Sequence, residues 1–177
     1  MKVKLWGTRG SVPVPQPIGA DRRLSLGGNT PCVEVRVAGC EPLVLDAGMG
    51  LHWLGNALLE EGFAQGQGRA HLLLTHAHWG HIQGIPFLTP PMLIPGNHFT
   101  FYGCGSSGYS FEELLNIQMD SVYCPVPNAF CREVGATTRI CEIDAGIFSI
   151  GPVRITTRRV NHVPGSVCLG YRLDTGS

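Results

Sequence analysis

Three histidines follow directly after a short apolar run, and this pattern constrains the fold more than any other feature of the chain. The run spans residues 71–74, and His76, His78 and His81 all lie within the next seven positions. Residues two apart in an extended segment point to the same side, so His76 and His78 can face one ion, while His81 follows as the chain turns. Imidazole nitrogen binds zinc, iron, nickel and copper. The pattern predicts a buried strand that ends in a metal-binding loop; the alternative is a polar turn with surface histidines.

The composition limits both the size and the partners of the protein. A chain of 177 residues is typical of one domain, so we expect a single domain over residues 1–177. The 13 basic and 13 acidic side chains cancel, so no strong field draws the protein to nucleic acid or to an anionic membrane. Residues 1–6 lack the apolar segment of a signal peptide, and no apolar run has membrane-spanning length. We therefore expect a cytoplasmic protein with a small-molecule partner.

The cysteines favour neither disulfides nor a thiolate zinc site. There are 7 of them, an odd number, and no two are spaced as a C-x-x-C pair. We expect most of them to be small buried hydrophobic residues. Cys104, in a glycine-rich turn, is the candidate for an exposed thiol.

Apolar and alternating patterns predict a layered α/β fold. Strands are expected at residues 2–6, 33–37, 43–45, 72–74, 99–102, 138–143, 147–150, 153–160 and 166–173. Leucines at helical spacing predict a helix over residues 51–61, and a capping-box pattern predicts one over residues 110–120. Residues 81–87 indicate a shorter helix, and residues 123–134 are expected to be irregular. The order of these elements favours packed layers of sheet and helix, with a strand meander in the last third.

Four segments together resemble the metallo-β-lactamase-fold hydrolases. They are the glycine-rich residues 7–11, residues 27–32, residues 45–48, and residues 74–86 with the sequence LTHAHWGHIQGIP. The similarity is greatest to the phosphodiesterase branch, which includes tRNA 3′-processing endonucleases and cyclic-nucleotide phosphodiesterases. The resemblance implies an αββα sandwich with a dinuclear metal centre, commonly zinc, at the edge where the two sheets meet.

The resemblance also assigns roles to individual residues. By position, His76, His78 and His162 are implied as ligands of the first metal, and His81 as a ligand of the second. Without the resemblance, His162 would be taken for a surface histidine in a turn after the expected strand at residues 153–160. Asp46 is implied as the residue that supports the histidine loop, because a ligand imidazole needs its other N–H held in place. A simple turn aspartate is the alternative for Asp46.

The sequence departs from the family pattern at two places. Gly80 stands where the family motif has an aspartate, so the second metal site loses a carboxylate. Family members also continue past the strand that ends here near Asp174, into segments that carry a bridging aspartate and a final histidine. We therefore expect a sandwich whose C-terminal part is missing and a centre that binds one ion. Zinc is expected, with Mn²⁺ or Fe²⁺ as alternatives, and metal-activated hydroxide rather than a side chain would be the nucleophile.

The function implied by the resemblance is hydrolysis of a phosphodiester. Because the chain is neutral, a small cyclic nucleotide is favoured over RNA. Arg9, Asn29 and Thr30, in the glycine-rich segments, are the expected substrate contacts. Arg22 and Arg23 could also meet a phosphate, and for Arg9, Arg22 and Arg23 alike the alternative is an exposed solubilising charge.

Two alternatives remain open, and both follow from the departures. The chain could be a degenerate member that binds a metal or a ligand without turnover, or a fragment that needs a partner chain. An incomplete second sheet would leave an edge and an apolar face open. We therefore expect a homo-oligomer.

Overall fold

The computed structural model describes residues 1–14 and 27–176, and these form two sheets. The larger sheet has six strands in the order β1-β2-β3-β4-β5-β6, and the smaller has three in the order β7-β8-β9. The strand bounds are β1 Lys2–Gly7, β2 Cys32–Arg36, β3 Leu43–Leu45, β4 Arg69–Leu73, β5 His98–Gly103, β6 Thr137–Glu142, β7 Gly146–Ile150, β8 Val153–Arg159 and β9 Leu169–Asp174. The strands β1 to β3 pair antiparallel and β3 to β6 pair parallel, while the smaller sheet is antiparallel throughout.

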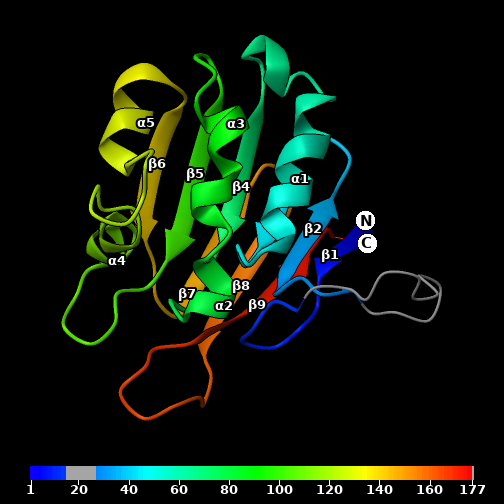
Figure 1. Ribbon diagram of the computed structural model, residues 1–177. Coiled ribbons are helices and arrows are strands. Elements are labelled where there is room, and N and C mark those ends of the chain that lie inside the picture. Colours follow the sequence, from blue (N-terminus) through cyan, green and yellow to red (C-terminus); the bar gives the residue numbers. More distant parts are fainter. Residues whose placement is uncertain (15–26, 177) are drawn as a thin grey trace.

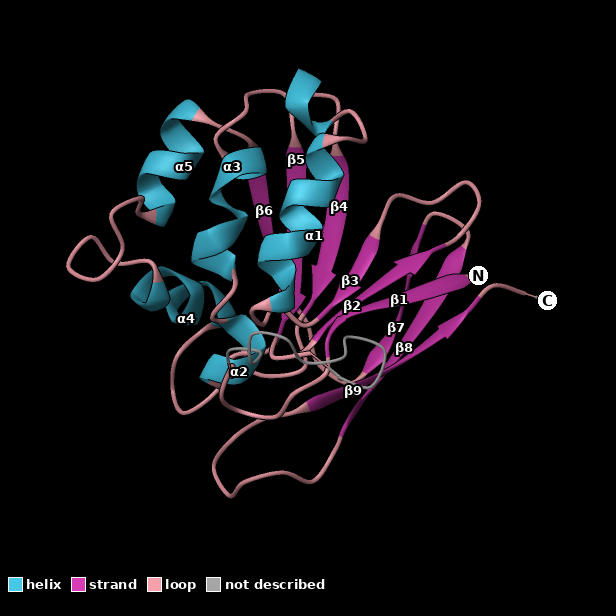
Figure 2. Cartoon of the chain, turned by 45° about the vertical axis from the view of Figure 1, so that its right-hand side comes forward, coloured by secondary structure: helices cyan, strands magenta, loops and turns pink. Residues whose placement is uncertain are grey.

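The helices cover one face of the larger sheet, and the smaller sheet covers the other (Figures 1 and 2). Their bounds are α1 Gly50–Leu59, η1 Phe63–Gln65, α2 Trp79–Ile82, η2 Ile85–Leu88, α3 Thr89–Met92, α4 Phe111–Gln118 and α5 Asn128–Val134. Within residues 1–14 and 27–176, no helix lies on the outer face of the smaller sheet. The described part therefore contains three of the four layers of the expected sandwich. None of its helices has the length and apolar character needed to cross a bilayer.

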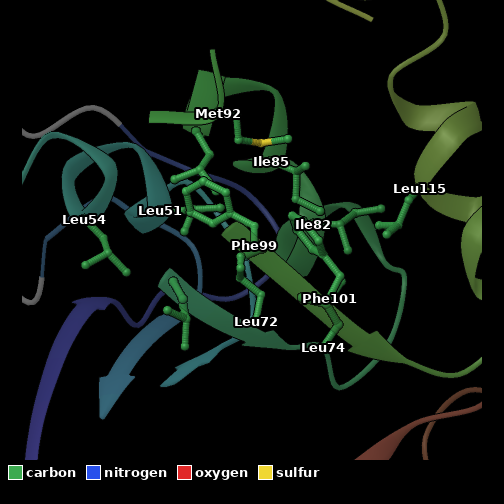
Figure 3. Packing of buried hydrophobic residues seen from close by; sticks show 14 of the residues in the cluster. Leu51, Leu54, Leu72, Leu74, Ile82, Ile85, Met92, Phe99, Phe101 and Leu115 are labelled. Atoms are coloured by element: carbon green, nitrogen blue, oxygen red, sulfur yellow. The ribbon is translucent and has the colours of Figure 1, made fainter. Parts of the chain in front are cut away.

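Residues 72–74 form a continuous apolar run because the strand β4 is covered by leucine-rich cores on both faces. Leu72 and Leu74 belong to the core between the larger sheet and the helices (Figure 3). Leu73 belongs to the second core, between the two sheets, where it joins Val153 and Ile155 of β8. Alternate residues of a strand point to opposite faces, so a strand covered on both sides needs apolar residues at every position. This burial anchors the histidine loop that follows.

Two expectations about the elements were wrong. Within the segment expected to be irregular, residues 123–134, the structure has the helix α5, which begins after Pro127 and buries Cys131 completely. The strand expected at residues 138–143 is not part of a meander, because β6 pairs in parallel with β5 and places Ile140 opposite Phe101. An apolar period marks a strand but does not say which neighbour it pairs with.

Candidate metal centre

The fold brings the predicted histidines together where the two sheets meet. His76 and His78 lie in the loop after β4 of the larger sheet, and His162 lies in the loop after β8 of the smaller one. One ligand nitrogen from each of these three histidines lies within 4.8 Å of the others. His78 Nδ1 and His162 Nε2 are 3.1 Å apart. Two loops separated by about half of the sequence thus build one cluster of imidazoles.

Hydrogen bonds from both sheets hold the histidine loop in place. The Leu74 N–H donates to Tyr102 O of the neighbouring strand at 2.8 Å. From the smaller sheet, the Leu169 N–H donates to Thr75 O at 2.8 Å, and the Tyr171 hydroxyl donates to Leu74 O at 2.7 Å. The loop is therefore fixed from two sides before any metal binds.

Asp46 organises the loop from the end of β3, with a carboxylate that is only 7% exposed. One oxygen accepts the Thr75 N–H at 2.8 Å and the Thr75 hydroxyl at 2.9 Å, and the other lies 2.8 Å from His81 Nδ1. The backbone at Asp46 has a φ of +61°, a region in which aspartate and asparagine are enriched among residues other than glycine. These contacts agree with the supporting role that the resemblance implies for Asp46.

The same contacts determine which ring nitrogens can bind a metal. A hydroxyl has one proton, and that of Thr75 is donated to the carboxylate, so Thr75 Oγ1 accepts from His76 Nδ1–H at 2.9 Å. His81 Nδ1 likewise donates to Asp46. Both imidazoles therefore keep their protons on Nδ1 and leave the Nε2 lone pairs free. Asp46 sets the tautomer of His81 directly and that of His76 through Thr75.

The electrostatic environment favours the neutral forms of His76 and His78. Burial, together with the neighbouring His81 and His78, lowers the pKa of His76 from its ordinary 6.5 to about 4. Burial and the nearby His162 also lower the pKa of His78. Metal binding requires neutral imidazole, so these ligands do not have to lose protons at pH 7.

The donor set fits a divalent ion. A tetrahedral zinc site with Zn–N bonds of about 2.0–2.1 Å places its nitrogens roughly 3.3 Å apart, close to the 3.1 Å between His78 Nδ1 and His162 Nε2. Among the described residues, the cluster that could hold an ion consists of His76, His78 and His162. His81 lies beside His76, with ring centroids 4.1 Å apart and ring planes tilted by 46°, but it is not a member of that cluster. The residues thus fit one metal ion with three protein ligands.

Gly80 supplies no side chain to this region. Its backbone packs against the glycine-rich loop, and a Cβ at this position would stand 3.0 Å from Ser11 Cα and 3.1 Å from Ser11 O. The family motif has a carboxylate at this position, next to His81. In this structure the Ser11 backbone leaves little room for such a side chain. A side chain at position 80 would require Ser11 to move by a few tenths of an ångström.

Cys168 lies beside the centre, although its sequence context did not single it out. Its Sγ is 3.7 Å from His76 Nδ1, the nitrogen that already donates to Thr75. Burial, and secondarily Asp46, raises the pKa of the Cys168 thiol, so the neutral form is favoured. The signal that the sequence offered for Cys168 was its position just before β9. The strand β9 pairs with β8, and His162 lies in the loop after β8.

A small hollow of about 290 Å³ adjoins His78. Its lining includes Ser106 and Ser107, whose hydroxyl groups bond with the loop that follows His162. Ser166 lines the same hollow. Serines in turns carry no sequence signal for a site, and only the fold brings these three to the imidazole cluster.

The three predicted substrate residues differ in their exposure and in their hydrogen bonds. Arg9 is exposed, while the Asn29 side chain donates to Trp6 O at 3.3 Å. Thr30 is fully buried, and its hydroxyl oxygen accepts from the Met49 N–H and from Gln83 Nε2, each at 2.8 Å. Thr30 would have to be uncovered before it could touch a ligand. A substrate role stays a prediction for all three, and Arg22 and Arg23 lie outside the described residues.

Comparison with solved structures identifies the fold. No protein-family model matches the chain, and no curated protein matches it. A new diphosphatase from the PhnP family is 18% identical, with a TM-score of 0.60 over 97% of this chain and 61% of its own. The metallo-β-lactamase fold protein YhfI from Bacillus subtilis is 18% identical, with a TM-score of 0.63 over 99% of this chain and 58% of its own. Zn²⁺-bound PqqB from Methylobacterium extorquens is 17% identical, with a TM-score of 0.60 over 98% of this chain and 59% of its own.

These similarities establish that the chain has the metallo-β-lactamase fold, as the four sequence segments predicted. The chain spans between 58% and 61% of the length of the three proteins. The histidine cluster stands at the meeting of the two sheets, where the resemblance placed the metal centre.

Proposed function

We propose that this chain is a metal-dependent hydrolase that acts on a small phosphodiester through a single metal ion. The observation that supports the proposal is the convergence of three imidazoles, from loops of two different sheets, onto one point. The tautomer of His76 is already set by Thr75 and Asp46. A cluster of surface histidines with no metal to bind would not need this arrangement.

Each residue contributes a separate part of the mechanism. His76, His78 and His162 would hold the ion as its three protein ligands. A bound divalent ion supplies a Lewis acid that brings the pKa of water toward neutrality and polarises a phosphoryl oxygen. Asp46, acting through Thr75, would hold His76 with its proton on Nδ1 and its Nε2 lone pair free for the ion. Ser106 and Ser166 line the hollow beside His78 and can donate hydrogen bonds to phosphoryl oxygens, whereas the Ser107 hydroxyl already donates to Gly165 O.

The charge of the chain and the names of two solved structures support this choice of substrate class. A chain with equal numbers of acidic and basic side chains does not attract a long polyanion. One protein of the same fold is named a diphosphatase, which supports a phosphorus–oxygen bond as the target, and another is Zn²⁺-bound, which supports zinc. A small phosphodiester, with a cyclic nucleotide as the favoured example, fits both considerations.

The second candidate function is binding of a metal or ligand without turnover. It is favoured by Gly80, because the absence of a carboxylate there removes a ligand for a second ion. Two ions clamp the attacking and leaving oxygens in many phosphodiesterases, and a single ion forgoes that clamp. Turnover under this proposal is therefore expected to be slow.

The test combines a metal count with hydrolysis of bis(p-nitrophenyl) phosphate. The chain is loaded with zinc, manganese or iron(II), and turnover of the ester is followed with and without chelator. We expect turnover that depends on metal and is lost in His76→Ala. The matched control is His52→Ala, which removes a histidine of α1 that is not part of the cluster. Metal bound by the wild type with no turnover would reject the hydrolase in favour of the binding function.

We also propose that the protein self-associates through its sheet edges. Val3 and Leu5 lie on β1, the edge strand of the larger sheet, and are 59% and 62% exposed. Ile147 of β7 is exposed at an edge of the smaller sheet. Exposed apolar edge strands are surfaces on which another chain can pair. Light scattering is expected to give a mass above that of one chain, and a monomer at working concentration would contradict it.

A further inference from the structure

His162 lies on a loop between β8 and β9 that projects from the two sheets (Figures 1 and 2). Residues 160–165 of this loop are exposed. The two ends of the loop are joined by the Val160 N–H, which donates to Cys168 O at 2.9 Å. That bond connects the loop to itself, so it does not fix the His162 imidazole relative to the other two ligand histidines. The position of His162 therefore depends on contacts from outside the loop.

A tight turn between β5 and α4 supplies such contacts. Ser106 and Tyr109 exchange backbone hydrogen bonds at 2.9 and 3.0 Å, and the two residues between them, Ser107 and Gly108, have φ values of +55° and +85°. Positive φ at both central residues is the pattern of a type I′ turn. The Glu142 carboxylate of β6 accepts backbone N–H groups on both sides of the turn. The turn is thus held firmly to the larger sheet.

Both serines of this turn form hydrogen bonds with the loop that carries His162. The Ser106 Oγ accepts the Val167 N–H at 3.2 Å, and the Ser107 hydroxyl donates to Gly165 O at 3.2 Å. One bond holds an N–H group and the other holds a carbonyl group two residues away, so together they fix the loop in both position and direction. The loop is thereby joined to the sheet that carries the other two ligand histidines.

The backbone at Ser107 has a conformation that serine rarely adopts. Within residues 1–14 and 27–176, the residues other than glycine with a positive φ are Asp46 and Ser107. Such a conformation costs free energy and persists where the surroundings require it, which is often at a functional site. Asp46 organises the loop with His76 and His78, and Ser107 bonds the loop with His162. Each loop of the metal centre thus has one such residue beside it.

We propose that Ser106 and Ser107 are positioning residues of the metal centre and that they act through His162. Their hydrogen bonds hold the exposed loop in the conformation that brings the His162 imidazole to the other two ligands. Less conformational entropy is then lost when the ion binds, so the bonds contribute to metal affinity. The inference rests on the metal site of the proposed function and does not depend on turnover.

The first test is the zinc affinity of Ser106→Ala, measured against a chromophoric chelator. No substrate is present, so a contact between Ser106 and a phosphoryl oxygen does not contribute. We expect the affinity to fall roughly 3- to 10-fold, the range that corresponds to one net hydrogen bond. Ser106→Thr keeps the hydroxyl and should bind zinc as the wild type does. The matched control is Ser149→Ala, which removes an exposed serine hydroxyl of β7 and should leave the affinity unchanged.

The Ser107→Gly variant separates positioning from stability. Glycine adopts a positive φ without strain, but it cannot donate a hydrogen bond to Gly165 O through a side chain. We therefore expect the urea midpoint of the metal-free chain to stay at the wild-type value or to rise, while the zinc affinity falls. A general loosening of the fold would lower both quantities.

The His162→Ala background tests whether the serines act through this histidine. Its residual zinc affinity is measured with a weaker chelator. Once the His162 imidazole is removed, Ser106→Ala should cause no further loss of affinity, because the two changes then affect the same interaction.

Three results would overturn the inference. They are wild-type zinc affinity in Ser106→Ala, an equal loss of affinity with and without His162, and a loss that Ser106→Thr does not restore. A wild-type chain that binds no zinc would overturn the inference together with the proposed function. The expected zinc affinities in a chain that does not hydrolyse the ester would support the inference and reject the hydrolase alone.

Discussion

Replacing Asp46 with asparagine should weaken both the fold and the metal centre. The carboxylate accepts the Thr75 N–H, the Thr75 hydroxyl and the His81 Nδ1–H. An asparagine can keep its oxygen toward Thr75, but its NH₂ group then faces the His81 N–H, and two donors oppose each other. Asparagine tolerates the positive φ of +61° at this position, so backbone strain does not contribute.

The magnitude follows from these three contacts. One hydrogen bond to a charged acceptor is lost, at about 1.5–3 kcal/mol, and the two to Thr75 become bonds to a neutral acceptor. We therefore expect Asp46→Asn to lower the free energy of unfolding by about 2–4 kcal/mol. The tautomer of His81 is no longer fixed, and that of His76 is held less firmly because Thr75 now donates to a neutral oxygen; loss of such support typically reduces metal affinity by about 10- to 100-fold.

Two measurements separate these effects. Urea unfolding in chelator gives the stability of the metal-free chain, and zinc titration against a chromophoric chelator gives the affinity. The control is Asp120→Asn, because that exposed side chain accepts the Val122 N–H through one oxygen and asparagine can do the same. It should change the free energy of unfolding by less than about 0.5 kcal/mol. An Asp46→Asn protein with wild-type stability and wild-type zinc affinity would refute the role assigned to this carboxylate.

Three further predictions concern pH, packing and metal content. In chelator, the free energy of unfolding should fall as the pH drops from about 6.5 toward about 4, because unfolded His76 takes up a proton that the folded form, with a pKa of about 4, does not; urea midpoints across this range that stay flat would contradict it. Gly48→Ala should cost about 2–3 kcal/mol in urea unfolding, since a Cβ there overlaps the Gly80 carbonyl, whereas Gly10→Ala meets nothing within 4 Å and should be neutral. Elemental analysis should find one divalent ion per chain and a loss of most of it in His162→Ala; two ions would contradict the three-histidine site.

The strand β4, which leads to His76 and His78, could be predicted because its leucines are buried on both faces. Residues 72–74 are all leucine, and a run of this kind followed by His76 and His78 leaves few alternatives to a central strand ending in a metal loop. The position of His162 could not be derived in the same way. It depends on how the smaller sheet packs on the larger one, a contact between Leu73 and Ile155 that no local pattern encodes. Only the family resemblance pointed to this histidine.

Features that depend on tertiary contacts were missed for a related reason. Cys168 and the three serines near His78 have unremarkable local contexts, and their meaning arises from loops that meet only in the folded chain. The helix α5 was not predicted because its sequence lacks an apolar period. It is stabilised instead by burial of Cys131 against the rest of the protein.

His81 has a structural role that does not require a second metal. Its Nδ1 donates to Asp46, its carbonyl accepts the Ala47 N–H at 2.7 Å, and its own N–H donates to His78 O at 2.8 Å. The residue thus ties the end of β3 to the histidine loop at three atoms, two of them in the backbone. Replacing the side chain would free one oxygen of Asp46 while leaving both backbone bonds intact. The presence of His81 is therefore no argument for a second ion, and the number of metals depends on position 80, where glycine offers no ligand and Ser11 leaves little room for one.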